Sequence, residues 1–224
     1  MGIAENLSRL KTEIPHEVRI IAVSKTMPVS DILQAYHTGH REFGENKAQE
    51  LAEKHGRLPS DIAWHMIGHL QTNKVKLIIP FVHLIQSIDS LKLFGVVEAE
   101  AAKAGRRIDC LLQVRIAREE TKFGLTTDDA ELVLKSYRSG AFPHTRITGM
   151  MGMATFTDNM LQVRNEFSKL VASFSSLRLK YFSDEPSFRE LSMGMSGDYK
   201  IALEEGSTMV RIGSLIFGER NYTP

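Results

Sequence analysis

The sequence predicts an α/β protein in which eight strands close into a single (β/α)8 TIM-type barrel, with an extra helix before the first strand. Short apolar runs rich in β-branched residues alternate along the chain with stretches of helical periodicity, as in parallel βαβ units. Eight such units fit a closed barrel, and the 224 residues fall slightly below its usual length. An open doubly wound sheet is the alternative, because it needs no eighth strand. No linker, low-complexity tract or break in composition divides the chain, so residues 1–224 are expected to form one domain.

The first half of the chain supplies the extra helix and four strand–helix units. Apolar side chains at Ile3, Leu7, Leu10 and Ile14 repeat at helical spacing, and Pro15 ends this helix. Apolar runs predict strands at residues 18–25, 40–46, 62–68 and 81–87. Amphipathic stretches predict helices at residues 29–39, 48–55, 71–79 and 90–105. A glycine or a proline ends each of these helices, at Gly39, Gly56, Pro80 and Gly105.

The second half continues the same alternation. Strands are predicted at residues 107–116, 146–153, 188–193 and 208–212. Residues 120–125 are expected to form a loop before a helix that begins near Thr126 and ends at Gly140. Further helices are predicted at residues 158–177 and 197–205, and residues 214–217 start a last helical turn. Because the alternation reaches an eighth strand, the closed barrel is preferred to the open sheet.

Composition and charge exclude several classes of protein. The formal net charge of +1 gives no bias toward nucleic acid or an anionic membrane surface. The chain has one cysteine, Cys110, so no intrachain disulfide can form and a reducing compartment fits. The N-terminal residues have no apolar core of a secretory signal, and no apolar run approaches the length of a membrane span. We therefore expect a soluble cytoplasmic protein without nucleic-acid or membrane partners.

The first predicted strand ends on a lysine, Lys25, and Pro28 follows shortly after it. In a barrel of this type the functional site lies at the C-terminal ends of the strands, which is where Lys25 is expected. A lysine that is desolvated in an apolar pocket can attack an aldehyde as the neutral amine. The alternative is a strand-end lysine whose ammonium group simply reaches the solvent.

Two stretches that contain glycine and serine follow the last two predicted strands, and each leads into a helix. Helix N-termini present N–H groups to an anion, and glycine lets the backbone approach a phosphate closely. The loops after strands seven and eight are a common phosphate site of this barrel. A phosphorylated ligand is therefore expected there, with Ser196 as hydroxyl donor and the N–H groups near Gly197, Gly213 and Ser214 completing the site. The alternative is that Ser196 and Ser214 only cap their helices.

Arg211 lies two residues before Gly213, where its side chain can enter the barrel. A phosphate site opposite a lysine that forms a Schiff base fits pyridoxal phosphate or an aldolase intermediate. An arginine in this place could donate a hydrogen bond to the ring nitrogen of a pyridine, which favours pyridoxal phosphate. A salt bridge at the barrel rim is the alternative explanation for Arg211.

The chain resembles the pyridoxal phosphate homeostasis proteins, a family related to the barrel domain of alanine racemase. The similarity covers nearly the whole length, in blocks at residues 22–26, 43–46, 65–74, 121–125, 191–196 and 206–213. Several blocks in the right order are more specific than any one of them. The resemblance implies a (β/α)8 barrel like the N-terminal domain of bacterial alanine racemase, here as a stand-alone domain.

The resemblance also implies a cofactor, pyridoxal 5'-phosphate, held as a Schiff base on Lys25. By the pattern of the related racemases, Arg211 would face the pyridine nitrogen, and Asn46 would lie near the cofactor on the strand-two side. The implied cofactor-binding residues are Lys25, Asn46, Ser196, Arg211, Gly213 and Ser214. The stretch at residues 151–156 differs from some relatives, so no detailed contacts are transferred there, and its methionines are expected to be strand core.

A cofactor carrier and an amino-acid racemase-like enzyme are the two candidate functions. An acid at the ring nitrogen strengthens pyridoxal phosphate as an electron sink, and arginine cannot supply that proton. Racemisation also needs a second base opposite Lys25, and no tyrosine falls at a predicted strand end: Tyr36, Tyr137, Tyr181, Tyr199 and Tyr222. We therefore expect a monomeric carrier for pyridoxal phosphate homeostasis, with apo forms of enzymes that depend on this cofactor as its acceptors.

Two further features are interpreted as structural. His65 and His69 have the spacing of a helical zinc pair, but no glutamate follows His65 and a strand is predicted to end at Gly68. Cys110 lies in an apolar run and is expected to pack in the core. No metal site is expected.

Overall fold

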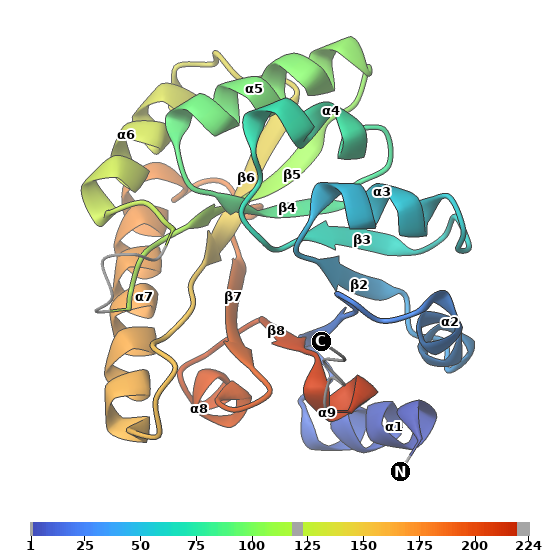
Figure 1. The fold of residues 1–224 in the computed structure, drawn as a ribbon. Coiled ribbons are helices and arrows are strands. Elements are labelled where there is room, and N and C mark those ends of the chain that lie inside the picture. The colour runs from blue at the N-terminus through green and yellow to red at the C-terminus, as the bar shows by residue number, and fades with distance from the viewer. Residues whose placement is uncertain (1, 118–122, 219–224) are drawn as a thin grey trace.

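The computed structural model describes residues 2–117 and 123–218, which form a closed barrel of eight parallel strands (Figure 1). The strands are β1 (Arg19–Val23), β2 (Glu42–Glu45), β3 (Ala63–Met66), β4 (Leu84–Ile88), β5 (Ile108–Gln113), β6 (Thr145–Met151), β7 (Glu190–Met195) and β8 (Met209–Ile212). Each strand pairs with the next along the chain, and β8 pairs with β1, where Ile20 lies opposite Val210. This closing pair confirms the predicted barrel and excludes the open doubly wound sheet.

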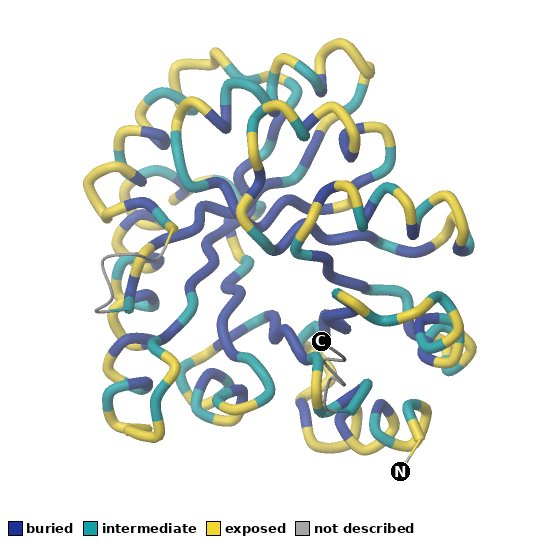
Figure 2. Tube along the Cα trace, in the orientation of Figure 1, coloured by how far each residue is buried: buried dark blue, intermediate teal, exposed yellow. Residues whose placement is uncertain are grey.

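The helices surround the barrel, and their buried faces turn toward the strands (Figures 1 and 2). They are α1 (Ile3–Glu13), α2 (Val29–His37), α3 (Ala48–His55), the 3-10 turn η1 (Thr72–Lys74), α4 (Val75–Ile78), α5 (Leu91–Lys103), α6 (Thr127–Arg138), α7 (Met160–Tyr181), α8 (Tyr199–Glu204) and α9 (Ser214–Phe217). None of the helices in the described ranges is long and apolar enough to cross a membrane.

The observed elements follow the predicted ones with three informative differences. All strands but one are shorter than predicted, because the ladder ends where the chain turns into each loop; β1 ends at Val23, so Lys25 lies beyond the strand instead of on it. The exception, β7, keeps the predicted length but lies two residues later in the chain. The helix predicted at residues 71–79 begins as the 3-10 turn η1, where Thr72 and Asn73 are poor helix formers. Helix α7 continues to Tyr181, past the predicted end. Residues 120–122 of the predicted loop and Tyr222 lie outside the described residues.

Two separate sets of apolar side chains fill the fold, because neighbouring residues of a strand point to opposite faces. A small cluster fills the barrel itself and consists of Ile21, Leu84, Leu111, Met151 and Met209. A larger core lies between the strands and the helices, and it includes the fully buried Cys110, which confirms the predicted packing role.

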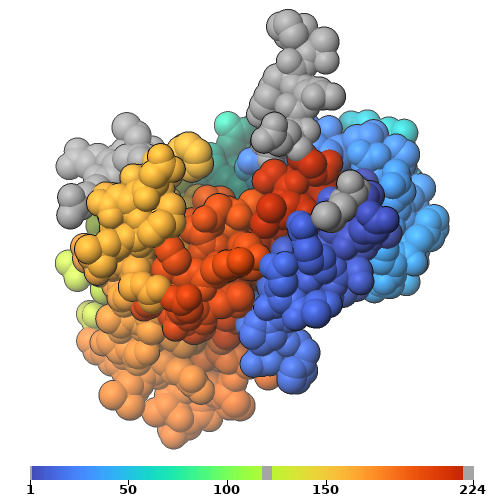
Figure 3. All heavy atoms as spheres, turned by 90° about the horizontal axis from the view of Figure 1, so that it is seen from below, coloured from blue at the N-terminus to red at the C-terminus, as the bar shows by residue number. Residues whose placement is uncertain are grey.

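The extra helix α1 packs against the C-terminal helical turn α9, so the two ends of the described chain lie side by side (Figure 3). Asn6 Nδ2 donates a hydrogen bond of 3.0 Å to the carbonyl oxygen of Ile216 in α9. Tyr199 in α8 donates from its hydroxyl to a carboxylate oxygen of Glu13 at 2.7 Å. Helix α1 therefore supports the two helices that follow β7 and β8.

We expect the free energy of unfolding to decrease at acidic pH, because His40 is buried in its neutral form. Burial lowers the pKa of His40 from 6.5 to about 4, and the ring nitrogen Nε2 lies 2.8 Å from the carbonyl oxygen of Glu42. Because the folded-state pKa is the lower one, only the unfolded chain binds a proton between these values, so stability present above pH 6.5 is lost as pH falls toward 4. The difference between the two pKa values corresponds to about 3 kcal/mol of unfolding free energy.

Urea unfolding of wild type and His40→Gln at pH values above 6.5 and near 4 measures this loss. The glutamine variant should show a shallower pH dependence, whereas His16→Gln, at a fully exposed position, should follow the wild type. The same pH dependence of the unfolding free energy in wild type and His40→Gln would show that His40 does not cause the loss of stability.

Candidate functional site

The candidate site lies at one end of the barrel, where the C-terminal ends of four neighbouring strands meet. Ala22 of β1 pairs with Ile212 of β8 on one side and with Phe43 of β2 on the other. The segments after β1, β2, β7 and β8 therefore leave the barrel on one rim. Loops at this end carry the functional residues of barrels of this type.

Lys25 lies in a tight turn directly after β1. Ser24 before it is fully buried, and Lys25 itself is half-buried. Thr26 after it has φ of +65°, a left-handed conformation that is unfavourable for a β-branched residue. A strained turn of this kind persists only where surrounding contacts hold it.

A buried charge cluster holds the backbone on both sides of Lys25. Lys54 on α3 donates from Nζ to the carbonyl oxygen of Ser24 at 2.7 Å, to Glu45 at 2.8 Å and to Glu50 at 2.7 Å. Ser24 also donates from its hydroxyl to Glu45 at 2.6 Å. The same oxygen of Glu50 accepts the backbone N–H of Thr26 at 2.6 Å. Lys54 and Glu50 thus fix the peptide groups before and after Lys25.

The two carboxylates of this cluster differ in their electrostatics. Burial raises the pKa of Glu45, and the Lys54 ammonium opposes that shift. Burial acts in the same direction on Glu50, but hydrogen bonds from Lys54 and from the Thr26 amide lower its pKa overall. Glu45 therefore depends on Lys54 for its charge, while Glu50 keeps its charge readily.

The two loops expected to bind phosphate meet on the same rim. The N–H of Gly213 donates to Ser196 Oγ at 3.2 Å, which joins the loop after β7 to the loop after β8. Ser196 and Gly213 are half-buried, and Ser214, the first residue of α9, is exposed. The hydroxyl and the backbone N–H groups that the sequence singled out therefore converge.

Asn46 follows β2 and is half-buried beside the end of β3. A Cβ atom at Gly68 would lie 2.4 Å from the carbonyl oxygen of Asn46, so only glycine allows this close approach of the two backbones. The position of Asn46 on the rim is thus determined by a close contact between neighbouring segments.

Arg211 points into the barrel and is buried. Its guanidinium donates from NH1 to Ser192 Oγ at 2.6 Å and from NH2 to the carbonyl oxygen of Gly152 at 2.9 Å. Burial lowers the pKa of Arg211 to about 10, and the Asp198 carboxylate opposes this shift. The arginine therefore remains charged at neutral pH and is held in a fixed orientation, and no salt bridge is formed at this position among the described residues.

A polar chain continues from Arg211 through the barrel interior. Ser192 donates from Oγ to Gln86 Oε1 at 2.7 Å, and Gln86 Nε2 lies 3.0 Å from Nδ1 of His65. Because Gln86 presents its amide nitrogen, His65 accepts on Nδ1 and carries its proton on Nε2. Burial lowers the pKa of His65 far below its usual value, so the ring is neutral.

The structure thus brings the six sequence-predicted residues to one rim or just beneath it, but it adds residues that the sequence did not single out. The cluster partner Lys54 and the interior residues Gln86 and Ser192 come from elements far from Lys25 along the chain. The sequence did contain one signal for Gln86, because it is a polar residue inside an otherwise apolar run. Of the two methionines predicted to be strand core, Met151 is buried at the end of β6, whereas Met153 lies beyond the strand and is half-buried. Phe156 is 96% exposed.

His65 and His69 do not share a helix, which removes the spacing argument for a zinc pair. His65 is buried in β3, and His69 lies beyond Gly68 with Nδ1 2.8 Å from Asp89. Within residues 2–117 and 123–218 no group of three His, Cys, Asp or Glu side chains could hold a metal ion.

Comparison with known families gives a match to nearly the whole chain. A family model described as alanine racemase, N-terminal domain, matches residues 2–221. A pyridoxal phosphate homeostasis protein from Aquifex aeolicus is 37% identical over 233 residues, which span 99% of this chain and 100% of the relative. A protein of the same name from Homo sapiens is 34% identical over 231 residues, which span 99% of this chain and 84% of the relative.

Solved structures agree with these relatives. PipY from Synechococcus elongatus, without pyridoxal phosphate, superposes with a TM-score of 0.90 at 33% identity, covering 97% of this chain and 100% of PipY. PipY with pyridoxal phosphate bound gives a TM-score of 0.86 at 32% identity, with the same coverage. An alanine racemase from Clostridium difficile shares the fold, with a TM-score of 0.76 at 12% identity, over 99% of this chain and 58% of the racemase.

We expect Lys54→Met to destabilise the protein by about 3 kcal/mol, because it leaves a buried carboxylate without its cation. Lys47→Met, at an exposed lysine directly before α3, is the matched control and should change stability by less than about 0.5 kcal/mol. Urea unfolding at neutral pH measures both. Equal stability of the two variants would show that the cluster does not hold the turn at Lys25.

Proposed function

The chain belongs to the family of the alanine racemase N-terminal domain and to the pyridoxal phosphate homeostasis proteins, and from this premise we propose that it binds pyridoxal 5'-phosphate and stores or delivers it in the cytoplasm. One observation carries the proposal: the turn at Lys25 and the paired loops of Ser196 and Gly213 lie on the same rim. An amine and a phosphate site at one barrel mouth are the two groups that this cofactor needs.

Each residue of the site has a role in this proposal. Lys25 would supply the amine to which the cofactor is joined, Ser196 would donate its hydroxyl to the phosphate, and Ser214 would contribute its backbone N–H, while the Gly213 N–H holds the Ser196 oxygen in place. Arg211, which is held by Ser192, would offer a charged N–H to the pyridine nitrogen. The donor set fits the cofactor, because hydroxyl and N–H groups gather where the phosphate would lie. When bound, pyridoxal phosphate supplies an aldehyde and a ring that can accept electrons.

The arrangement supports a carrier more than an enzyme. Arg211 holds its protons tightly, so it does not strengthen the ring as an electron sink in the way that an acid would. The described tyrosines lie on outer helices, and three of them donate their hydroxyls to carboxylates there: Tyr36 to Asp61, Tyr181 to Glu131 and Tyr199 to Glu13. None of these is placed to act as a second base opposite Lys25.

One observation favours the alternative, a racemase-like enzyme. His69 and Asp89 form a histidine–carboxylate pair on the β3–β4 side of the same rim, and the His69 side chain is 38% exposed. A histidine oriented by a carboxylate is a common general base. In the carrier proposal this pair is structural, with the His69 ring stacked on Phe123 at 3.9 Å.

We expect one molecule of the cofactor to be joined to Lys25. Borohydride reduction of protein incubated with pyridoxal phosphate, followed by peptide mass spectrometry, should tag Lys25, because its turn lies on the same rim as the loops of Ser196 and Gly213. Lys25→Ala should remove the tag, and Lys11→Ala, at an exposed lysine on α1, should leave it in place. A tag on another lysine of the wild type would refute the assignment.

We expect no turnover of amino acids by the loaded protein, because no described tyrosine and no acid at the ring nitrogen supports the chemistry. The measurement is a panel of amino acids assayed for racemisation and transamination, with wild type, Lys25→Ala and His69→Gln. Turnover that disappears in both variants would establish the racemase-like alternative. Transfer of the cofactor to an apo enzyme, tested by recovery of that enzyme's activity, would support delivery, with the monomeric chain as donor.

A further inference from the structure

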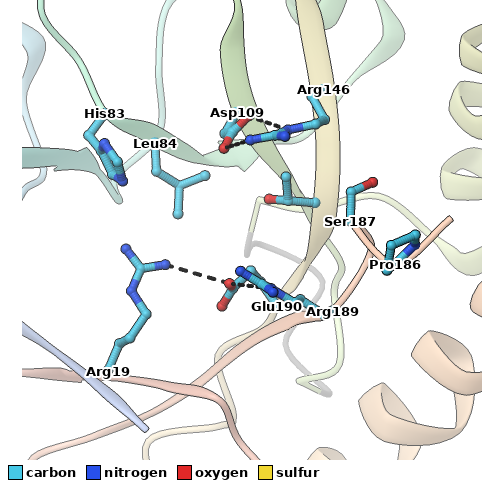
Figure 4. A pocket seen from close by; sticks show the side chains of 10 residues that line it. Arg19, His83, Leu84, Asp109, Arg146, Pro186, Ser187, Arg189 and Glu190 are labelled. Carbon is cyan, nitrogen blue, oxygen red and sulfur yellow. Dashed lines mark hydrogen bonds and ion pairs between the residues drawn. The ribbon is translucent and has the colours of Figure 1, made fainter. Parts of the chain in front are cut away.

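The opposite end of the barrel contains a cavity of about 240 Å³ (Figure 4). Side chains at the beginnings of the strands line it, which places it at the floor, far from the rim of Lys25. The interior of a (β/α)8 barrel is normally filled by side chains. A volume somewhat below the roughly 300–1,000 Å³ of drug-sized sites suits a small metabolite or ion. We call this space the floor cavity.

Three arginines from different segments reach the floor cavity: Arg19, Arg146 and Arg189. Arg19 donates from Nε to Glu42 at 3.0 and 3.1 Å, but its NH1 lies 3.7 Å from Glu190, beyond a normal hydrogen bond. Arg189 Nε is 3.6 Å from Glu190, and the Arg189 side chain is 75% exposed. Both guanidinium groups therefore keep N–H donors that no side chain of the described residues accepts.

The carboxylates of the cavity do not balance these donors. Both oxygens of Asp109 are taken by Arg146, at 2.8 and 2.7 Å. Glu190 accepts one long hydrogen bond, of 3.3 Å, from Thr208 within the described chain. A fitting ligand should thus present several oxygen acceptors to the arginines and one hydroxyl to Glu190.

The polar chain through the barrel adds a further donor at this end. Its last member, His65, is fully buried, and Nε2 has no hydrogen-bond partner among the described residues. The Glu42 carboxylate lies 3.7 Å from this nitrogen, and the ring of His83, which lines the floor cavity, is centred 5.6 Å from the His65 ring. The hydrogen bonds of the interior therefore run from Arg211 toward the floor and end in the unsatisfied N–H of His65, which is buried behind the residues that line the floor cavity.

We propose that the floor cavity is a second ligand site, which binds a small phosphate-bearing molecule such as hydrogen phosphate or a phosphate monoester. Arg19 and Arg189 bind the phosphate oxygens, and Glu190 accepts an O–H of the phosphate or of an attached hydroxyl group. Charge-assisted bonds of this kind are strong and directional. Sulfate has the same shape but carries no O–H at neutral pH, so it donates no hydrogen bond to the Glu190 carboxylate and is repelled by its charge.

The test is a titration of the full chain with inorganic phosphate, followed by backbone-amide NMR at constant ionic strength. Saturable shifts are expected at the floor residues Arg19, His83 and Glu190. Arg189→Gln should weaken this binding about tenfold, the effect of one lost charge-assisted hydrogen bond. Arg178→Gln, at an exposed position of α7, is the control and should bind like the wild type.

A parallel titration with sulfate tests the role of Glu190. Sulfate should bind the floor about tenfold more weakly than phosphate, a preference that Glu190→Gln should abolish, because an amide can donate to either anion. If Glu190→Gln does not fold, the ratio of the phosphate and sulfate affinities of the wild type tests the proposal instead. Equal binding of the two anions, the absence of saturable floor shifts, or shifts confined to Ser196 and Gly213 would each overturn the proposal. Because the readout is resolved by residue, it does not depend on the function of the rim.

Discussion

The buried ammonium of Lys54 is the interaction on which the barrel mouth depends. It is stabilised because each of its contacts is an oxygen: the Ser24 carbonyl, Glu45 and Glu50. A buried charge without such acceptors would cost several kcal/mol, at roughly 3–5 kcal/mol for breaking a pair. Glu50 extends the cluster to the Thr26 amide, which offsets the strain of the left-handed backbone at Thr26. The backbone around Lys25 is thus held by α3 as much as by β1.

The interior of the barrel contains a second buried cation, Arg211. Arg211 is buried with its charge and is bonded to a hydroxyl and a carbonyl oxygen instead of a carboxylate. Its positive charge favours an arrangement in which Ser192 and then Gln86 turn their donors away from the mouth. The guanidinium therefore remains available for a neutral acceptor at the mouth, such as a pyridine nitrogen. A carboxylate partner would have saturated it.

Local patterns of the sequence were sufficient to predict the alternation, the barrel and the rim residues. Apolar runs and helix-ending glycines act over short distances, so strands and helices could be located to within a few residues. The charge cluster could not be predicted, since Lys54 is 30 residues from Ser24 and appears in the sequence as one more lysine on an amphipathic helix. Gln86 and Ser192 are 106 residues apart, and they meet only because the barrel closes. The floor cavity depends on side-chain lengths across several strands, which no periodicity encodes.

Both ends of the barrel are built from the same inward-facing positions. Arg211 and Met209 share one face of β8, and Arg19 and Ile21 share one face of β1, so along each strand the charged and the apolar side chain follow one another inside the barrel. A polar chain that crosses an apolar layer must end in a donor or an acceptor on each side. Here Arg211 begins the chain, so a donor emerges at His65, near Arg19, whose guanidinium keeps N–H groups beyond the one that binds Glu42. The excess of donors at the floor is therefore a consequence of placing an arginine, instead of an acid, at the mouth.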